Sequence, residues 1–312
     1  MSKFVWSKFK AVLILVLICS CRTAPEAGDH ETALGQLIAP QAQNLPDPYQ
    51  GANKSAGCAK QTQGGGVEDL SIQAGSLSRR YLRVMPKRLT QGKPMALVFW
   101  WHGAASSPEL TRSTPNYNHS PELEKLTGDD VIWLHPRHID GTSQTWDRSN
   151  NGRDFQFFDK LFTLVTDEFC IDLKKVFTIG VSNGGTFANH IASVRSSNIK
   201  GVVAVAVPAM GGSWRRVTMP SMLIQDNRDN FSSAQLTIRK MAQDAECNMQ
   251  SVNLTAKTPA SCFLLPSCKP DTPVAFCPWQ IKSDSNPHDW PRFDGADAQI
   301  WRFLTSGKVS SI

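Results

Sequence analysis

The stretch that most constrains the fold is KKVFTIGVSNGGTFANHI, from Lys174 to Ile191. An apolar, β-branched run ends at Gly180, Ser182 follows between Gly180 and Gly184, and the next residues are typical of a helix. A strand that turns directly into a helix needs glycines, because side chains on either side of the turn would clash. The stretch therefore predicts a sharp strand-to-helix turn with the Ser182 hydroxyl exposed at its apex.

Strand-like and helix-like segments alternate on both sides of this turn. We expect strands at 79–86, 95–103, 131–136, 175–181, 199–209, 220–225 and around 272–281, and helices at 155–169, 183–194, 232–246 and 296–306. This order predicts an α/β fold with a mainly parallel sheet and helices on both of its faces.

The first twenty residues indicate export. Three lysines precede the apolar run AVLILVLICSC, which has the length of a signal peptide rather than of a membrane span. Its end, Ile18 to Cys21, resembles a bacterial lipoprotein cleavage site, so we expect a signal peptide at 1–20 and a lipid on Cys21. An ordinary signal cleaved before Ala27 is the alternative. The expected location is periplasmic, cell-surface or secreted, with membrane contact only through the lipid.

The rest of the chain divides by composition. Residues 21–66 are polar and contain too few large apolar residues for a core, so they predict a tether, followed by a catalytic domain at 67–306 and a short tail at 307–312. Loss of three lysines with the signal lowers the formal charge from +6 to +3, which is too mild to favour a nucleic-acid partner.

Six cysteines remain outside the signal and the lipid site: Cys58, Cys170, Cys247, Cys262, Cys268 and Cys277. An even number in an exported chain favours disulfides. A zinc site is disfavoured, because no CxxC pair or histidine-rich spacing accompanies these cysteines. We expect neither a metal nor an organic cofactor.

A serine hydroxyl attacks only when a base takes its proton and a carboxylate holds that base. α/β-Hydrolases place these residues in the order serine, acid, histidine. Among the seven histidines, only His288 lies beyond the helix that follows Ser182, in the loop SDSNPHDWP. We expect His288 to be the base, and a surface loop histidine is the alternative.

The acid has two candidates in the segment PSMLIQDNRDN, and the oxyanion donors have three. Asp229 lies further from the strand than Asp226 and can swing toward the histidine, so we favour it, with Asp226 as the alternative acid. The backbone N–H of Asn183 and one from Gly103 or Ala104 are the expected oxyanion hole. We expect His102, beside them, to orient the loop by packing.

These segments resemble a known group of proteins. SAGCAK (55–60), RRYLRVMP, the HG pair after a strand, DEFCIDLKKVFTIGVSNGG and HDWP are similar, in order, to the secreted feruloyl esterase and polyhydroxybutyrate depolymerase group of α/β-hydrolases. The resemblance covers about residues 55–306, and it implies the same nucleophile, acid and base. Two departures stand out: Asn286 and Pro287 replace glycines before the histidine, and QDNRD replaces HGTxD.

The resemblance also implies disulfides and an activity. It pairs Cys58 with Cys170 and Cys247 with Cys268, which leaves Cys262 and Cys277 as a third pair. It implies a monomeric serine ester hydrolase acting through an acyl-enzyme on feruloyl or acetyl esters of polysaccharide, or on polyhydroxybutyrate. A peptidase of this fold is one alternative. The other is a non-catalytic surface protein that binds a glycan or polymer through its nine tryptophans.

Overall fold

The computed structural model describes residues 51–60, 62–113, 121–139, 145–208, 214–254, 262–280 and 286–310. The expected signal peptide, the lipidation site Cys21 and most of the tether lie outside the described residues, as do the last two residues of the tail. None of the described helices has the length and apolar character needed to cross a bilayer.

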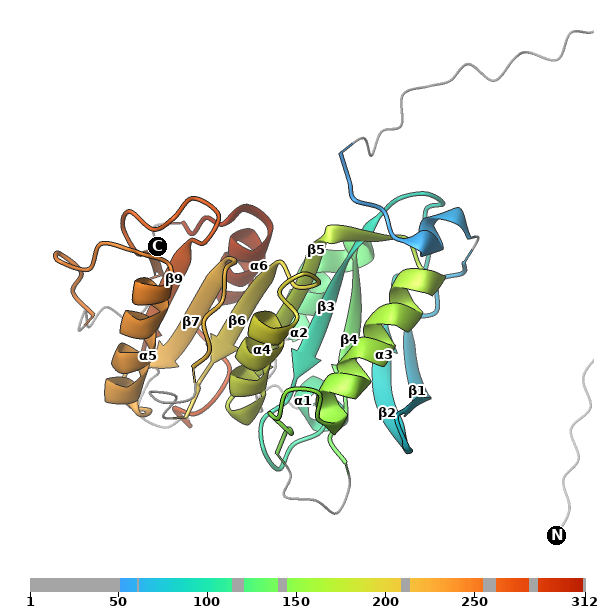
Figure 1. Ribbon diagram of the computed structural model, residues 1–312, viewed down its shortest axis with the longest axis horizontal. Coiled ribbons are helices and arrows are strands. Elements are labelled where there is room, and N and C mark those ends of the chain that lie inside the picture. The colour runs from blue at the N-terminus through green and yellow to red at the C-terminus, as the bar shows by residue number, and fades with distance from the viewer. Residues whose placement is uncertain are drawn as a thin grey trace, which may run out of the picture. The chain divides into compact units, whose positions relative to one another are not determined.

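Nine strands of the described part form one sheet, and Figure 1 shows it from β9 on the left to β1 on the right. In spatial order they are β1 (Val67–Ala74), β2 (Leu77–Val84), β4 (Val131–Pro136), β3 (Met95–Trp101), β5 (Ile171–Val181), β6 (Gly201–Val205), β7 (Ser221–Asp226), β9 (Val274–Trp279) and β8 (Phe263–Leu264). Neighbours from β4 to β9 are parallel, and the outer pairs β1 with β2, β2 with β4, and β8 with β9 are antiparallel. The prediction of a mainly parallel sheet is confirmed.

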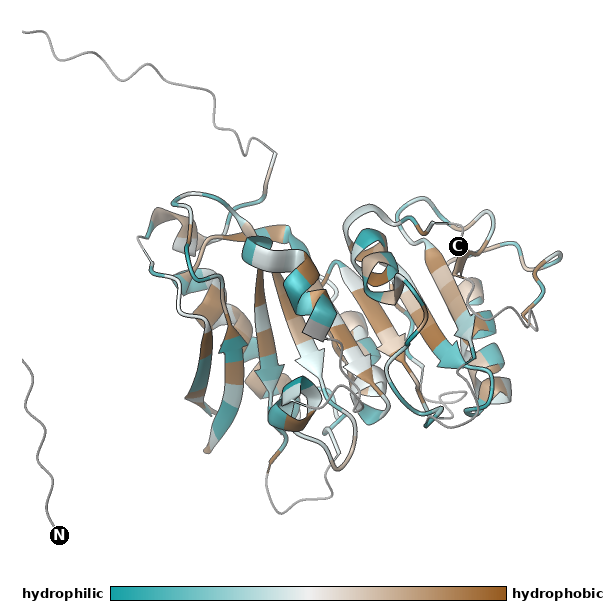
Figure 2. Ribbon diagram, turned by 180° about the vertical axis from the view of Figure 1, so that it is seen from behind, coloured by the Kyte–Doolittle hydropathy of each residue, from teal (hydrophilic) through white to brown (hydrophobic). Residues whose placement is uncertain are grey.

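Helices cover both faces of this sheet, as expected (Figures 1 and 2). One face packs against α3 (Arg153–Glu168), α4 (Asn183–Val194) and α5 (Phe231–Asp244), and the other against α2 (Pro121–Thr127) and α6 (Ala296–Ser306). Successive strand residues point to opposite faces. Phe99 of β3 therefore meets Phe158 of α3, with 4.6 Å between ring centroids, while Val98 joins the cluster that contains Ile300 of α6. The short helix α1 (Pro108–Ser113) follows β3.

Three expected elements have the predicted bounds, and others differ for local reasons. The strand at 131–136 and the helices at 183–194 and 296–306 are as predicted. The strand expected to reach residue 209 ends at Val205, because Ala206 has a positive φ of 47°. Strand β1 was not predicted. It is an edge strand whose residues alternate between exposed and partly buried, so it carries no continuous apolar run (Figure 2).

The end of the expected tether packs on the domain. Ser55 Oγ donates to the carbonyl of Phe169 at 2.8 Å and accepts from the N–H of Ile171 at 2.9 Å, and a disulfide joins Cys58 to Cys170. A Cβ at Gly57 would lie 2.2 Å from the Phe169 carbonyl oxygen, so only glycine fits there. The folded part therefore extends N-terminally beyond Val67, to about residue 53, and includes the 3-10 turn η1 (Ala56–Ala59).

Candidate active site

Ser182 occupies a strained turn between β5 and α4. Its φ is 54° and its ψ is −122°, a region that residues other than glycine rarely adopt. Its N–H donates to Val205 on β6 at 2.8 Å, and its carbonyl accepts the N–H of Thr186 at 3.1 Å. The strained residue is therefore held from both sides, at the carboxyl edge of the parallel strands.

The glycines of the motif allow this turn. A Cβ at Gly184 would lie 2.1 Å from the carbonyl oxygen of Trp101, and a Cβ at Gly180 would lie 2.1 Å from the carbonyl oxygen of Gly184. Real Cβ atoms do not approach backbone so closely, so α4 can begin against the end of β3 only because these side chains are absent. This is the physical requirement that the sequence pattern indicated.

His288 lies between Ser182 and Asp229. Its Nε2 is 2.7 Å from Ser182 Oγ, and its Nδ1 is 2.7 Å from Asp229 Oδ2. A proton on Nδ1 donates to the carboxylate and leaves the Nε2 lone pair facing the hydroxyl, which is the tautomer that a general base requires. The His288 N–H donates to Asn286 Oδ1 at 3.0 Å, so the residue that departs from the usual glycine shapes this loop.

Asp229 and Asp226 have different partners. The Asp229 carboxylate accepts from Gln225 Nε2 at 2.7 Å and from Asn230 Nδ2 at 3.2 Å, in addition to His288. Asp226 is fully buried and accepts from the backbone N–H of Arg228 at 2.8 Å and from its Nε at 3.2 Å. The structure thus brings Asp229 to the histidine and uses Asp226 to close the turn after β7.

The expected oxyanion donors lie at the start of α4 and just after the end of β3, which are adjacent. Asn183 begins α4, so its N–H has no partner within the helix and lies at the positive end of the helix dipole. Gly103 and Ala104 follow β3, whose last residues contact the start of α4 as described above.

His102 is the first residue after β3 and is packed beside the expected oxyanion donors. It is 1% exposed, its Nδ1 lies 2.8 Å from the Gly103 carbonyl oxygen, and its ring contacts those of Trp146 and His138. Burial lowers the pKa of His102 from 6.5 to about 3, although the bond to Gly103 acts in the opposite direction. The ring is therefore neutral near neutral pH.

Two residues at the site were not predicted from the sequence. Gln225 donates to Asp229, and Trp146 donates to His102 and Asn183 beside the expected oxyanion hole. Gln225 is the first residue of QDNRD, the segment noted above as a departure from the family pattern, and Trp146 belongs to no motif named above. That departure, and the position of Gln225 before Asp226 at the end of an apolar strand, were the signals available for Gln225. Trp146 was only one of nine tryptophans considered for binding a glycan or polymer.

Three disulfides lie in the described part, joining Cys58 to Cys170, Cys247 to Cys268 and Cys262 to Cys277. These are the pairs implied by the family resemblance. Among the described residues, no group of three or more histidine, cysteine or acidic side chains is arranged to hold a metal ion.

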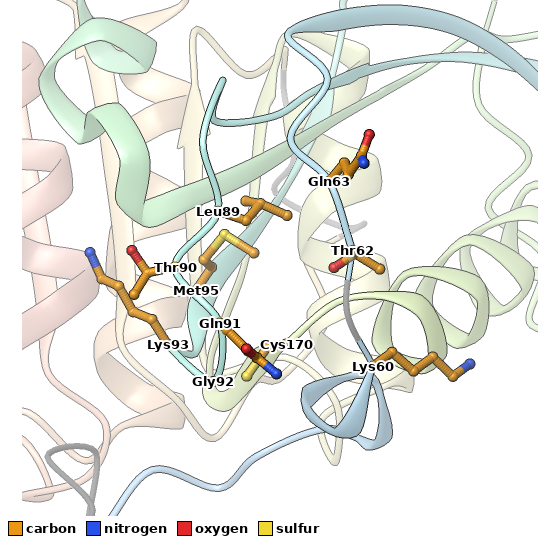
Figure 3. A pocket seen from close by; sticks show the side chains of 10 residues that line it. All are labelled: Lys60, Thr62, Gln63, Leu89, Thr90, Gln91, Gly92, Lys93, Met95 and Cys170. Carbon is orange, nitrogen blue, oxygen red and sulfur yellow. The ribbon is translucent and has the colours of Figure 1, made fainter. Parts of the chain in front are cut away.

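A hollow of about 330 Å³ lies at the opposite end of the sheet from Ser182 (Figure 3). Met95 begins β3 and Cys170 precedes β5, so the hollow opens at the amino ends of the parallel strands. Lys60 and Lys93 on its rim point away from it in Figure 3. Reaction chemistry at Ser182 therefore has no direct access to this hollow.

The chain is similar in sequence to feruloyl esterases. Feruloyl esterase D of Neurospora crassa is 30% identical over 169 residues, which are 52% of this chain and 56% of that protein. The chain spans about half the length of the curated relatives it matches. No family model matches the chain.

Solved structures share the fold at low sequence identity. The S-formylglutathione hydrolase FrmB of Staphylococcus aureus has a TM-score of 0.52 and 11% identity, and the match covers 78% of this chain and 98% of that one. Acetyl xylan esterase from Aspergillus awamori also has a TM-score of 0.52, with 12% identity over 77% of this chain and 100% of that one. The chain therefore has the α/β-hydrolase fold, and over about half of its length it is similar in sequence to feruloyl esterases.

Proposed function

We propose that the protein is an exported serine carboxylic-ester hydrolase that uses Ser182 as nucleophile, His288 as base and Asp229 as the carboxylate that orients His288. The observation that carries the proposal is the pair of 2.7 Å contacts made by His288, one to the serine hydroxyl and one to the carboxylate. The strained turn at Ser182 supports it, because strain is maintained where function requires an exposed nucleophile.

The reaction follows from these contacts. His288 Nε2 takes the proton of Ser182 Oγ while the oxygen attacks the ester carbonyl, and the charge that develops on the carbonyl oxygen is stabilised by backbone N–H groups of Asn183 and Gly103 or Ala104. His288 then gives the proton to the departing alcohol. Water attacks the acyl-enzyme by the reverse sequence and releases the acid. Asp229 stabilises the imidazolium that forms in both halves.

The proposed substrates are feruloyl or acetyl esters of polysaccharide. The support is the similarity to feruloyl esterase D of N. crassa, which extends over about half the chain. Polyhydroxybutyrate-type polyester is the other substrate class that the family resemblance implies. Export is supported by the three disulfides, which persist in oxidising compartments. The lipid on Cys21 remains part of this proposal.

The experiment compares wild type and Ser182→Ala on p-nitrophenyl acetate, with Ser221→Ala as the matched control. Ser221 is a buried serine at the start of β7, and its hydroxyl donates to the Met219 carbonyl away from the site. We expect activity to fall by about 10³-fold or more in Ser182→Ala and to persist in Ser221→Ala. An inactive but folded wild type would contradict catalysis and favour a binding protein.

A second assay separates the substrate classes. Methyl ferulate, acetylated xylan, hydroxybutyrate oligomers and an N-acetyl amino acid p-nitroanilide are compared by kcat/KM on the same preparation. We expect hydrolysis of methyl ferulate or acetylated xylan to exceed that of the other two. Preferential cleavage of the anilide would instead identify a peptidase of the same fold.

A further inference from the structure

Trp146 makes hydrogen bonds to both segments that supply the expected oxyanion donors, the residue after β3 and the first residue of α4. Its indole Nε1 donates to the carbonyl oxygen of His102 at 2.9 Å, and its backbone N–H donates to Asn183 Oδ1 at 2.9 Å. The side chain is only 3% exposed and is fixed by ring contacts with Trp101 at 4.9 Å and Phe187 at 5.5 Å.

The indole bond to the His102 carbonyl fixes the direction of the Gly103 N–H. The His102 carbonyl and the Gly103 N–H belong to the same planar peptide group, which is trans, so they point in opposite directions. An indole N–H that holds the carbonyl therefore fixes the direction of the Gly103 N–H. It also polarises the peptide, which makes that N–H a stronger donor.

The second bond acts on the other donor. Asn183 follows the nucleophile directly and begins α4, so its backbone N–H shares the strained turn of Ser182. Holding its side chain from the Trp146 backbone restricts the rotation of this first helical residue. One residue thus links β3 to α4 beside the nucleophile.

The loop that carries Trp146 is itself anchored. The N–H of Asp147 donates to Asp154 Oδ2 at 2.6 Å, and Asp154 Oδ1 pairs with Arg79 Nη2 at 2.7 Å. Both members of this ion pair are almost fully buried. The loop is therefore tied to β2 and to the first turn of α3, and Trp146 has a rigid base from which to position other groups.

We propose that Trp146 is a positioning residue for the oxyanion hole, which rests on the function proposed above. The oxyanion donors stabilise a charge that develops on the substrate carbonyl oxygen only in the transition state. Loss of the Trp146 indole bond should therefore lower kcat and leave KM nearly unchanged. A role limited to stability would instead reduce the amount of folded enzyme without changing kcat per active site.

The test uses two substitutions that remove the indole N–H. Trp146→Phe retains an aromatic ring, and replacement of Trp146 by benzothienylalanine retains the indole shape with sulfur in place of N–H. The matched control is Trp133→Phe in β4, which removes a similarly buried indole hydrogen bond, from Nε1 to Thr127 Oγ1 at 3.1 Å, away from the site. Active sites are counted by phosphonate labelling of Ser182.

We expect both Trp146 variants to lose about 10-fold or more in kcat per labelled site, with KM changed less than about 3-fold. The affinity for phenylboronic acid, which forms a tetrahedral adduct with serine, should fall by a similar factor. The Trp133→Phe control should retain both values. Unchanged kcat and boronate affinity in the Trp146 variants of an active protein would overturn this inference alone, whereas an inactive wild type would overturn the proposed function as well.

Discussion

Gln225 donates its side-chain amide twice to Asp229, to the backbone carbonyl oxygen at 2.6 Å and to carboxylate Oδ2 at 2.7 Å. Oδ2 is the same atom that contacts His288 Nδ1. Gln225 is fully buried within β7, so a rigid strand position fixes the carboxylate that lies beyond the turn. The orientation of the histidine therefore depends on a glutamine that touches neither the nucleophile nor the base.

Replacing Gln225 with leucine should reduce both stability and turnover. Loss of hydrogen bonds to a buried charged group lowers the free energy of unfolding by about 1–3 kcal/mol, and a loosened carboxylate should lower kcat about 10-fold. Gln299→Leu is the matched control, because Gln299 is a buried glutamine that bonds Ser310 from the terminal helix. Urea unfolding and p-nitrophenyl acetate turnover measure the two effects. An equal fall of kcat in both variants would contradict a specific role for Gln225.

Mutation of Asp226, the last residue of β7, and of Asp229, in the turn that follows, should have different effects on activity and stability. Asp229→Asn leaves the geometry but favours the wrong histidine tautomer, so we expect kcat to fall by about 10³- to 10⁴-fold. Asp226→Asn weakens the bonds to Arg228, so we expect a loss of about 1–2 kcal/mol of stability with most of the activity retained. Steady-state kinetics and urea unfolding of both variants check this. A reversed pattern would assign the acid to Asp226.

The turn at Ser182 could be predicted from the sequence because the constraint is local. Glycines flank the strained Ser182. A side chain at Gly180 would clash with the backbone of Gly184, and one at Gly184 would clash with the backbone at the end of the neighbouring strand β3. The order of Asp229 and His288 along the chain then limited the partners, because parallel strands bring their carboxyl ends to one edge. A few side chains therefore sufficed to identify the three residues that meet.

The supporting residues could not be predicted in the same way. Trp146 acts through bonds to His102 and Asn183, which are 44 and 37 residues away along the chain, and no sequence pattern encodes that contact. The segment around Ser55 was assigned to a tether because it lacks apolar residues. Hydrogen bonds hold it on the domain, which composition does not reveal, together with the disulfide between Cys58 and Cys170 that the family resemblance implied.

Removal of the bridge between Cys58 and Cys170 should destabilise the protein without changing catalysis. The bridge lies before β5, at the end of the sheet opposite Ser182, so the Cys58→Ala/Cys170→Ala variant should retain its kcat at 25 °C. It spans 112 residues, whereas the bridge between Cys247 and Cys268 spans 21. Chain entropy predicts a loss of about 3–5 kcal/mol for the longer loop and less for the shorter one.

Chemical unfolding of the two double-alanine variants measures this order. The Cys247→Ala/Cys268→Ala variant is the comparison, because it removes a bridge of the same chemistry from a smaller loop. A larger loss in that variant would show that local packing, rather than closure of the long loop, determines what the bridges contribute.

The buried neutral ring of His102 should make the protein less stable in mild acid. Burial lowers the pKa of His102 in the folded state to about 3, whereas an unfolded chain binds the proton near pH 6.5. Between these values the unfolded state holds more protons, so falling pH favours unfolding. The contribution of the neutral ring is complete above about pH 6.5 and is lost toward pH 3, with a limiting slope of about 1.4 kcal/mol per pH unit.

His102→Asn isolates this contribution, because asparagine retains a side-chain N–H that can reach the Gly103 carbonyl and does not titrate. Urea unfolding at steps from pH 7 to pH 4.5 should show the wild type losing about 2–3 kcal/mol more than the variant. The difference between the two proteins removes the other groups that titrate in this range. Equal slopes would mean that His102 takes up its proton within the folded protein.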